Sequence, residues 1–510
     1  MPSYLSPGVY VEEVDSGSRP IEGVGTAVAA FVGLAEKGPF DSPTLVANWT
    51  QFTATFGGFM ANTSLAQAVF AYFQNGGGNC YIVRIGQDGS GSPNGSPHRS
   101  IEPGAAQAEI GNVKAVALES GSADGHLSVE IAEPDEGAPE GSVKLVVKRG
   151  DEVVETHTGT VGGRGQHNLK TVVANDSKLI KIEVVSGQSG GELVPGQSAA
   201  LVAPAPTAEV PSTLSSEDYV GKVETRTGFS GLEAIDDITM VAIPDLMTAY
   251  AQKAVDLDTV KQVQLAMIAH CELMGDRMAI LDTPPGLNAQ QIKQWRTETA
   301  GYDSKYAAMY WPWVGVGKGE YLPPSGFMAG IWGRNDDTRG VHKAPANEVV
   351  RGAVEIETQI TRNEHDMLNP YGINCIRAFP GRGIRVWGAR TLSSDPSWRY
   401  LNIRRLFNYL EESILDGTNW VVFEPNDPAL WARLRRTISA FLTNEWRRGA
   451  LFGLTPDEAF FVKCDAETNP AEGIDAGEVV CQIGVAPVKP AEFVIFRLSQ
   501  YSGGTSLVAE

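Results

Sequence analysis

The hydrophobic pattern of the chain changes repeatedly between helical spacing and short apolar runs. Serine, aspartate or asparagine precedes several of the helical stretches, and glycine follows them, as expected for capped helices. The intervening apolar runs are short and rich in residues that favour strands. Helices and strands therefore alternate, which predicts a layered α/β core. The predicted elements are helix 64–74, strand 80–86, a long helix within 245–275, strand 276–282, helix 288–300 and strand 305–316.

The last quarter of the chain has a different pattern. An amphipathic helix is predicted over 399–415, and a second is predicted from Pro428 to about Arg448, opened by Asn426 and Asp427. The apolar run WVVFEP between them is interpreted as a strand. Three late strands are predicted at 459–465, 477–488 and 491–499. This pattern predicts an α+β domain at the C-terminal end.

One long stretch lacks aromatic residues altogether. No Phe, Trp or Tyr lies between Tyr81 and Tyr219, although the chain has 18 Phe, 10 Trp and 14 Tyr. Linkers rich in Gly, Ser and Pro border this stretch at 86–100 and 203–217. The β-branched runs inside it, including SVKLVVKRGDEVVETHTG, predict strands and hairpins. We therefore predict an inserted all-β domain with a small aliphatic core, carried by a discontinuous main domain.

Composition and charge limit the function. Hydrophobic residues make up 42% of the 510 residues and the formal net charge is −20, so a nucleic-acid partner is not expected. No apolar stretch is long enough for a transmembrane helix, and the N-terminus does not resemble a signal peptide. The five cysteines are widely spaced and contain no CxxC, so neither a disulfide framework nor a zinc site is indicated. These features predict a protein that is assembled in the cytoplasm.

The search for catalytic chemistry yields no catalytic, cofactor-binding or metal-binding residue. The glycine-rich segments GVGKGE and GRGIRVWG lack phosphate-loop spacing and are interpreted as turns. His365, in NEHDM, is a weak candidate, and no histidine lies at ligand spacing from another histidine or a cysteine. Arg149-Gly150-Asp151 spells an adhesion tripeptide but lies where a hairpin needs a turn. A hydrolase of unknown substrate and a secreted adhesin remain as alternatives.

Both ends of the chain carry short strand-like segments beyond flexible or proline-rich connections. Such strands can either complete a sheet of their own chain or add to the edge of a neighbour's sheet, and the pattern leaves both open. The residues expected to form these arm strands are Val9, Tyr10, Val11 and Val14 at the start, and Phe493, Val494, Ile495 and Phe496 at the end.

Several segments, in this order, resemble the contractile tail sheath proteins of phages, R-type bacteriocins and extracellular contractile injection systems. They are PGVYVEEV, WTQFTATFGGF, NCYIVRI, FSGLEAIDDITMVAIPD, DRMAILDTPPG, SKYAAMYWPWV, NPYGINCIRAFPGRGIRVWGARTL, WRYLNIRRLFNYLEESI and IGVAPVKPAEFVIFRLSQ. The resemblance implies a structural, non-enzymatic subunit that polymerises helically around an inner tube, on a baseplate and under a cap. It also implies contraction that drives the tube through a target envelope, and a particle that can be released from the cell.

The resemblance refines the domain boundaries. We expect an N-terminal arm at 1–20, an α/β core at 21–86 and 219–375, the inserted domain at 87–218, a C-terminal sheath domain at 376–487 and a C-terminal arm at 488–510. The inserted domain carries 17 acidic and 9 basic residues between 87 and 215 and is expected to face outward and to be dispensable for assembly. The helix from Pro428 resembles the position from which such sheaths touch the tube. The candidate tube contacts are Arg433, Arg435, Arg436, Arg447 and Arg448.

Overall fold

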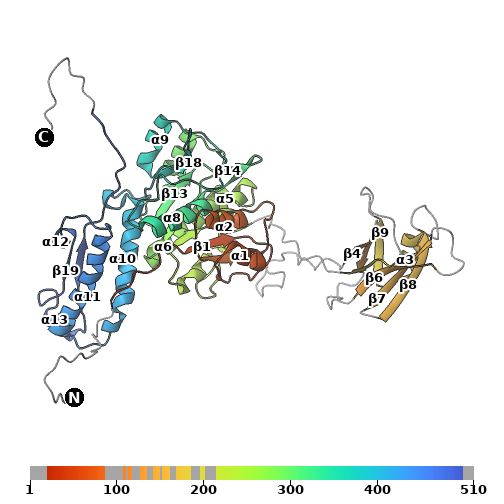
Figure 1. The fold of residues 1–510 in the computed structure, drawn as a ribbon, viewed down its shortest axis with the longest axis horizontal. Coiled ribbons are helices and arrows are strands. Elements are labelled where there is room, and N and C mark those ends of the chain that lie inside the picture. Colours follow the sequence, from red (N-terminus) through yellow and green to blue (C-terminus); the bar gives the residue numbers. More distant parts are fainter. Residues whose placement is uncertain are drawn as a thin grey trace, which may run out of the picture. The chain divides into compact units, whose positions relative to one another are not determined.

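The chain divides into two compact units in a computed structural model (Figure 1). The first unit comprises residues 1–86 and 210–510, and the second comprises 87–209. Each unit is described by itself. The structure describes residues 20–86, 107–110, 113–117, 127–134, 142–149, 152–160, 168–177, 179–184, 196–201 and 214–497.

An eight-stranded sheet in the order β18-β17-β13-β12-β11-β1-β3-β2 forms the centre of the first unit. The six inner strands from β17 to β3 run parallel, and the edge strands β2 and β18 are antiparallel to their neighbours. Every residue of β1, β11, β12 and β13 is buried, as expected for a parallel sheet with both faces covered. The strands are β1 (Ala29–Gly33), β2 (Thr44–Val46), β3 (Cys80–Arg84), β11 (Met240–Ala242), β12 (Met278–Leu281), β13 (Ala307–Trp311), β17 (Ile373–Phe379) and β18 (Gly383–Val386).

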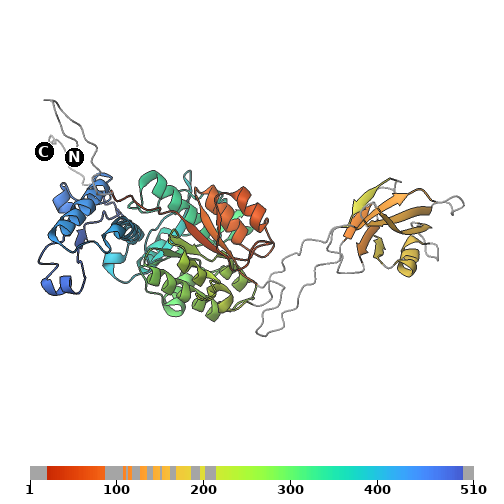
Figure 2. The same ribbon diagram turned by 90° about the horizontal axis from the view of Figure 1, so that it is seen from below.

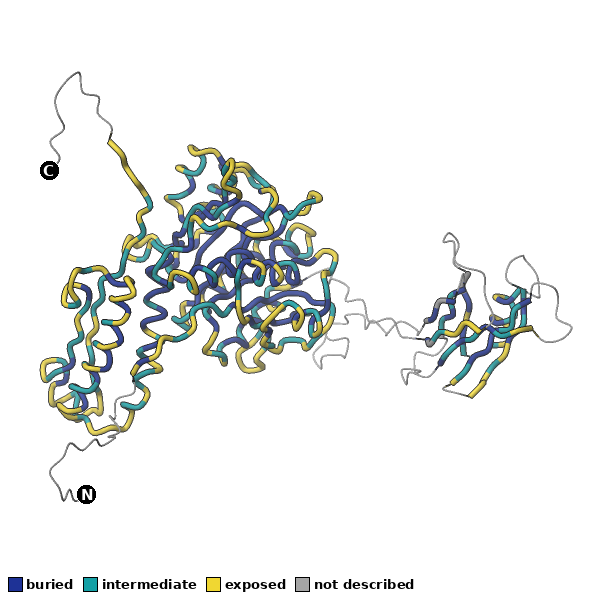
Figure 3. Tube along the Cα trace, in the orientation of Figure 1, coloured by how far each residue is buried: buried dark blue, intermediate teal, exposed yellow. Residues whose placement is uncertain are grey.

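Helices pack around this sheet, and the buried trace lies at the centre of the unit (Figures 2 and 3). They confirm the predicted alternation of helix and strand. The helices are α1 (Trp49–Phe56), α2 (Leu65–Gln74), α4 (Ser216–Val220), α5 (Pro244–Ala251), α6 (Leu257–Met274), α7 (Ala289–Gln294) with the π-helical turn η2 (Trp295–Ala300), α8 (Ser325–Arg339) and α9 (Arg362–Leu368). A small sheet of β14 (Val314–Gly317), β15 (Glu320–Leu322) and β16 (Glu355–Ile356) lies beside them.

The long helix predicted within 245–275 is confirmed as α6, and the shorter helix α5 precedes it. The two are separated by a turn in which Lys253 adopts a left-handed φ of 64°. The side chain of Asp256 then accepts a hydrogen bond from the Thr259 amide at 2.8 Å and starts α6.

The start of α2 is capped by a residue far away in the sequence. The predicted cap, Ser64, makes no side-chain cap hydrogen bond. Instead, the buried carboxylate of Asp245 accepts hydrogen bonds from the amides of Ser64 and Leu65, and also from Leu34 at 2.6 Å. Burial raises the pKa of Asp245 to about 6, and these amide hydrogen bonds oppose the shift. Asp245 thus ties α2, β1 and α5 together.

The C-terminal part of the first unit contains α10 (Leu401–Thr418), α11 (Pro428–Arg447), α12 (Pro456–Ala459) and α13 (Ala471–Asp475), with a sheet of β19 (Phe460–Lys463) and β20 (Gln482–Val485). Its core includes Leu406, Trp431 and Phe441. The strand predicted at WVVFEP is wrong. This segment holds the 3-10 turn η5 (Asn419–Val421), and Phe423 is fully exposed.

The second unit is rich in strands but is not all-β. Its two sheets have the orders β10-β6-β7-β8 and β4-β5-β9, around an aliphatic core. The segment 170–186 is one of the β-branched runs predicted as strands and hairpins, but its first part belongs to α3. In α3, Leu169 and Val173 are buried one helical turn apart, and the Asn168 side chain accepts a hydrogen bond from the Lys170 amide at 2.9 Å. The elements are β4 (Gln107–Ile110), β5 (Val113–Ala117), β6 (Leu127–Ala132), β7 (Ser142–Arg149), β8 (Glu152–Thr160), α3 (Leu169–Asp176), β9 (Ile180–Val184) and β10 (Ser198–Ala200).

Candidate interaction surfaces

Burial determines the titration of two described histidines. His270 lies in the core beside the Arg277 guanidinium at 3.5 Å, and burial with this neighbouring charge lowers its pKa to about 4. Burial also lowers the pKa of His365, although the nearby carboxylates of Asp366 and Glu492 oppose the shift. In the described part of the chain, no three His, Cys, Asp or Glu side chains are grouped so that they could hold a metal ion. His98, His126 and His167 lie outside the described residues.

The glycine-rich segments are turns, as predicted. GVGKGE spans the end of β14 and the start of β15, which are antiparallel neighbours. GRGIRVWG contains the turn between β17 and β18. Arg149 ends β7 directly opposite Glu152 of β8, so the adhesion tripeptide lies at a hairpin, although Gly150 and Asp151 are outside the described residues. None of the three segments lies at the start of a helix that could receive a phosphate.

A cavity of about 680 Å³ lies between the sheet and α10. Its wall is acidic, and Arg405, which also lines it, forms an ion pair with Asp336 at 2.5 Å. Burial raises the pKa of Glu412, and the neighbouring carboxylates raise it further. The cavity therefore contains mutually repelling carboxylates rather than a nucleophile with a base. The acidic lining residues are Asp236, Asp237, Asp276, Glu412 and Asp416.

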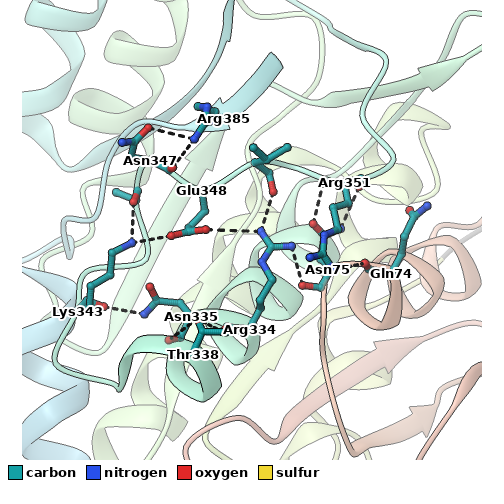
Figure 4. Close-up of polar contacts among 12 residues, drawn as sticks. Gln74, Asn75, Arg334, Asn335, Thr338, Lys343, Asn347, Glu348, Arg351 and Arg385 are labelled. Carbon is teal, nitrogen blue, oxygen red and sulfur yellow. Dashed lines mark hydrogen bonds and ion pairs between the residues drawn. The ribbon is translucent and has the colours of Figure 1, made fainter. Parts of the chain in front are cut away.

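A polar network holds the segment 343–351 against α2 and α8 (Figure 4). The Asn75 side chain accepts from the Arg351 amide at 2.9 Å and donates to the Arg351 carbonyl at 3.1 Å. Arg334 of α8 donates to the Asn75 carbonyl at 2.9 Å and to the Val349 carbonyl at 2.7 Å. Glu348 accepts from Lys343 at 2.7 Å. These contacts satisfy backbone groups, so we assign the network to the stability of the fold.

Glu492, within the segment 488–510 predicted as the C-terminal arm, is held by the rest of the chain. This half-buried carboxylate accepts from Arg390 at 2.6 and 2.9 Å, from Asn369 at 2.7 Å and from Tyr400 at 3.1 Å. Burial raises its pKa, but the hydrogen bonds from Arg390 and Asn369 outweigh burial and hold it below the ordinary value. Sequence reasoning missed this anchor, although a glutamate between Pro490 and a run of apolar residues was a visible signal.

Residues 493–497, which follow Glu492, are exposed (Figure 3). Phe493, Val494, Ile495 and Phe496 are 72%, 69%, 78% and 84% exposed, and residues 491–497 belong to no strand of the described chain. Four consecutive large apolar side chains in water are unfavourable, because both faces of the segment remain solvated. The N-terminal arm residues Val9, Tyr10, Val11 and Val14 lie outside the described residues.

The predicted arginine cluster on α11 separates into two groups. Three members have partners in the same chain: Arg433 pairs with Glu424 at 2.9 Å, Arg448 pairs with Glu445 at 2.8 Å, and Arg435 donates to the Cys464 carbonyl. Arg436 and Arg447 are exposed and form no ion pair with a described residue. They are eleven residues apart, or about three helical turns, and therefore lie on the same face of α11.

The sheet of β19 and β20 has only two strands, paired antiparallel from Phe460 opposite Val485 to Lys463 opposite Gln482. Phe461 is 58% exposed and Ile483 is 36% exposed. Phe452 and Leu454 are also exposed beside it, and the Phe452 amide donates to the Ala486 carbonyl at 2.7 Å. A two-stranded sheet is marginally stable alone, and its free edges can accept further strands.

Comparisons with known proteins point in one direction. Two family models match: the phage tail sheath protein central domain over residues 224–392 and the phage tail sheath C-terminal domain over 393–500. A tail sheath protein of Burkholderia phage BcepMu is 24% identical, with 96% of this chain and 95% of that protein aligned. A tail sheath protein of Vibrio phage KVP40 is 30% identical over 35% of this chain, which corresponds to 26% of that protein.

The solved structures agree on the fold. The anti-feeding prophage (AFP) helical sheath in the contracted state has a TM-score of 0.60 and 24% identity, with 97% of this chain and 99% of that chain covered. The sheath complex of PVC, an extracellular contractile injection system, in the contracted state has a TM-score of 0.59 and 23% identity, with 98% and 99% covered. Within the described residues, no helix is both long and apolar enough to cross a membrane.

Proposed function

The chain belongs to the contractile tail sheath family and is a structural subunit of a contractile sheath, and we propose that its terminal arms link such subunits into a helical polymer around an inner tube. The hydrolase and adhesin alternatives have no support from these relatives. The polymer would assemble in the cytoplasm on a baseplate, and its contraction would drive the tube through a target envelope. The observation that carries the proposal is the exposed apolar run from Phe493 to Phe496.

The C-terminal arm is suited to strand addition in a neighbouring subunit. Glu492 anchors its root to the α/β core, while the following residues pair with no described strand of their own chain. An extended peptide that adds to a sheet edge gains backbone hydrogen bonds and buries alternate side chains on each face. Because both faces of the arm are apolar, a receiving site between a sheet edge and a helix would cover both. This argument favours pairing between chains over pairing within one chain.

The sheet of β19 and β20 is the best receiving edge on the described surface. It has two strands, backs onto α11, and carries the exposed side chains of Phe461 and Ile483. A third strand from a neighbour would cover these side chains and lengthen a sheet that is marginal alone. Backbone pairing of this kind could persist while the globular parts of two subunits rotate, so the lattice could shorten without dissociating.

The basic face of α11 is the proposed contact with the tube. Arg436 and Arg447 carry this face, because Arg433, Arg435 and Arg448 are already held by their own chain. Exposed ion pairs contribute only about 0–1 kcal/mol each and weaken in salt. Such contacts would be weak individually and repeated along the polymer, which suits a tube that must be released on contraction.

A truncation tests the proposal directly. A chain ending at Pro490 removes Glu492 and the apolar run but keeps both cores. Expressed alone and with the tube protein of the same particle, the full chain should form hollow ridged tubes in negative-stain electron microscopy and sediment as a polymer. The truncated chain should stay a folded monomer in both cases. Polymers of normal morphology from the truncated chain would refute arm-mediated assembly, and the full chain remaining a monomer with the tube present would refute the whole proposal.

A further inference from the structure

Two cysteines flank the end of the β19–β20 ladder, because Cys464 directly follows β19 and Cys481 directly precedes β20. The register pairs Phe461 with Gly484 and Lys463 with Gln482. Continued by one residue, the same register places Cys464 opposite Cys481. Each thiol influences the pKa of the other, as expected for neighbouring groups, and both cysteines are free.

The backbone geometry at this pair suits a disulfide. Facing residues of an antiparallel ladder have Cα atoms about 4.5–5.5 Å apart, and disulfides span Cα separations of about 4.4–6.8 Å. Asn469 fixes both sides of the pair: its amide nitrogen donates to the Cys464 sulfur at 3.7 Å, and its side-chain oxygen accepts from the Val480 amide at 2.6 Å. The bond could therefore close with little backbone movement.

We propose that Cys464 and Cys481 form a reversible dithiol that closes to an intrachain disulfide when the protein meets a small-molecule disulfide. A structural zinc ion is disfavoured because it needs about four ligands, and no third His, Cys, Asp or Glu joins the two thiols among the described residues. The remaining cysteines, Cys80, Cys271 and Cys375, are buried in the other core. They provide internal controls for any general oxidation.

The reaction is a pair of thiol–disulfide exchanges, with oxidised glutathione as the oxidant. The partly exposed Cys481 attacks first as a thiolate, forms a mixed disulfide and releases one glutathione thiolate. The Cys464 thiolate then attacks the Cys481 sulfur and releases the second. Two electrons pass from the cysteines to glutathione, and the two thiol protons end on the two released glutathione molecules. No other reactant is needed.

The surroundings determine the rate. Burial raises the pKa of Cys481 to about 12 and raises that of Cys464, while the positive charge of Arg435 opposes both shifts. Exchange requires the thiolate, so it should be slow near neutral pH and accelerate as pH rises. The closed bond would enclose α13 and fix the register of β19 against β20. Only its consequence for the lattice, in which this sheet receives a neighbour's arm, rests on the proposed function.

Mass spectrometry of the purified full-length chain tests the inference without requiring polymerisation. The chain is first reduced, and then incubated with excess oxidised glutathione at mildly alkaline pH. We expect a loss of about 2 Da and two fewer alkylatable thiols out of five. Trypsin cannot show the link, because no Lys or Arg lies between Cys464 and Cys481. Cleavage at Glu472 and Glu478 separates them, so the fragments should stay joined until a reductant is added.

Variants distinguish the steps. Cys464→Ser should stop at a glutathione adduct on Cys481, and Cys481→Ser should lose no thiols. The double Ser variant should melt like the reduced chain, which controls for misfolding. The inference is overturned if the folded wild-type chain keeps five free thiols, stops at the adduct, or links one of the other three cysteines instead. Failure of the chain to polymerise would bear on the proposed function and leave this result unaffected.

Discussion

Arg390 holds Glu492 through two guanidinium nitrogens, Nη2 at 2.6 Å and Nε at 2.9 Å, although the two residues are 102 positions apart. The same arginine donates through Nη1 to the Asn369 carbonyl at 3.1 Å, so its position is fixed on the other side. Glu492 is the last residue of the described C-terminal segment with a side-chain partner in the rest of the protein, and residues 493–497 after it are exposed. The ion pair therefore lies directly before the exposed apolar run that is proposed as the arm strand.

Removing this anchor should weaken assembly more than folding. In Glu492→Ala, Arg390 and the other donors around it lose their carboxylate acceptor but stay partly buried. We expect this to lower the free energy of unfolding by about 1–3 kcal/mol. The start of the proposed arm is then no longer held in one orientation. The yield of polymer in sedimentation should therefore fall several-fold. Glu492→Gln keeps the shape and part of the hydrogen bonding and should lie between. Glu472→Ala, at an exposed glutamate on α13, is the matched control. Normal polymer yield from Glu492→Ala would show that the anchor does not direct the arm.

The α11 prediction concerns two arginines only. The double variant Arg436→Glu/Arg447→Glu should have a free energy of unfolding within about 0.5 kcal/mol of the wild-type value, because both side chains are exposed and form no ion pair with a described residue. Binding to the tube protein at low salt should fall about tenfold or more, and the salt dependence of binding should decrease. Co-sedimentation at low and high salt measures both. Reversal of Arg339 and Arg362, exposed on α8 and α9, changes the charge equally and should leave tube binding intact.

The buried carboxylate of Asp282 makes stability depend on pH. It accepts from the Ser325 amide at 2.8 Å and the Ser325 hydroxyl at 2.6 Å, and burial raises its pKa to about 7 against the opposing hydrogen bonds. A raised folded-state pKa means stability that is present at low pH and lost as pH rises through 7. Ionisation of Asp282 should lower the free energy of unfolding by about 2 kcal/mol between pH 5 and pH 8. The free energy of unfolding measured with urea should therefore decrease with rising pH across that range in the wild type, and it should decrease less in Asp282→Asn.

The local signals in the sequence predicted elements best where capping and burial agree. Asp427 and Pro428 start α11 as predicted, with the Asp427 carboxylate accepting from the Leu430 amide at 2.7 Å. Where only residue composition favoured a helix or a strand, packing in the folded protein determined the secondary structure. The β-branched residues near Val173 form a helix because Leu169 and Val173 face the core together. The apolar residues at 420–423 belong to no strand of the described chain, although their composition favoured one.

The candidate interaction surfaces could be predicted only in part, because they depend on contacts between residues that are far apart in the sequence. The arm run Phe493–Phe496 was visible as a pattern, but its exposure and its anchor at Glu492 required the fold. The arginine cluster was visible as charge, but which members were free depended on partners such as Glu424. Cys464 and Cys481 lie far apart in the sequence, so their proximity could be inferred only from the antiparallel register of β19 and β20. Sequence spacing gives separation along the chain, and antiparallel pairing brings distant positions together.

Deletion of the second unit separates folding of the main body from any role of the inserted residues. The second unit has its own aliphatic core and strand ladders, and its sheets contain no strand of the first unit. A variant that replaces residues 87–209 by a flexible Gly/Ser linker of about ten residues, with a root-mean-square span of roughly 18 Å, should therefore fold. Its melting transition should match that of the main body in the full chain.

Assembly of this variant is the informative measurement. The inserted domain is acidic and lacks the aromatic side chains that usually anchor interfaces, so hollow tubes should still form. Those tubes should be narrower in electron microscopy if the domain faces outward. A longer linker controls for strain at the junction. A folded variant with either linker that cannot polymerise would contradict the prediction, because it would place lattice contacts on the inserted domain itself.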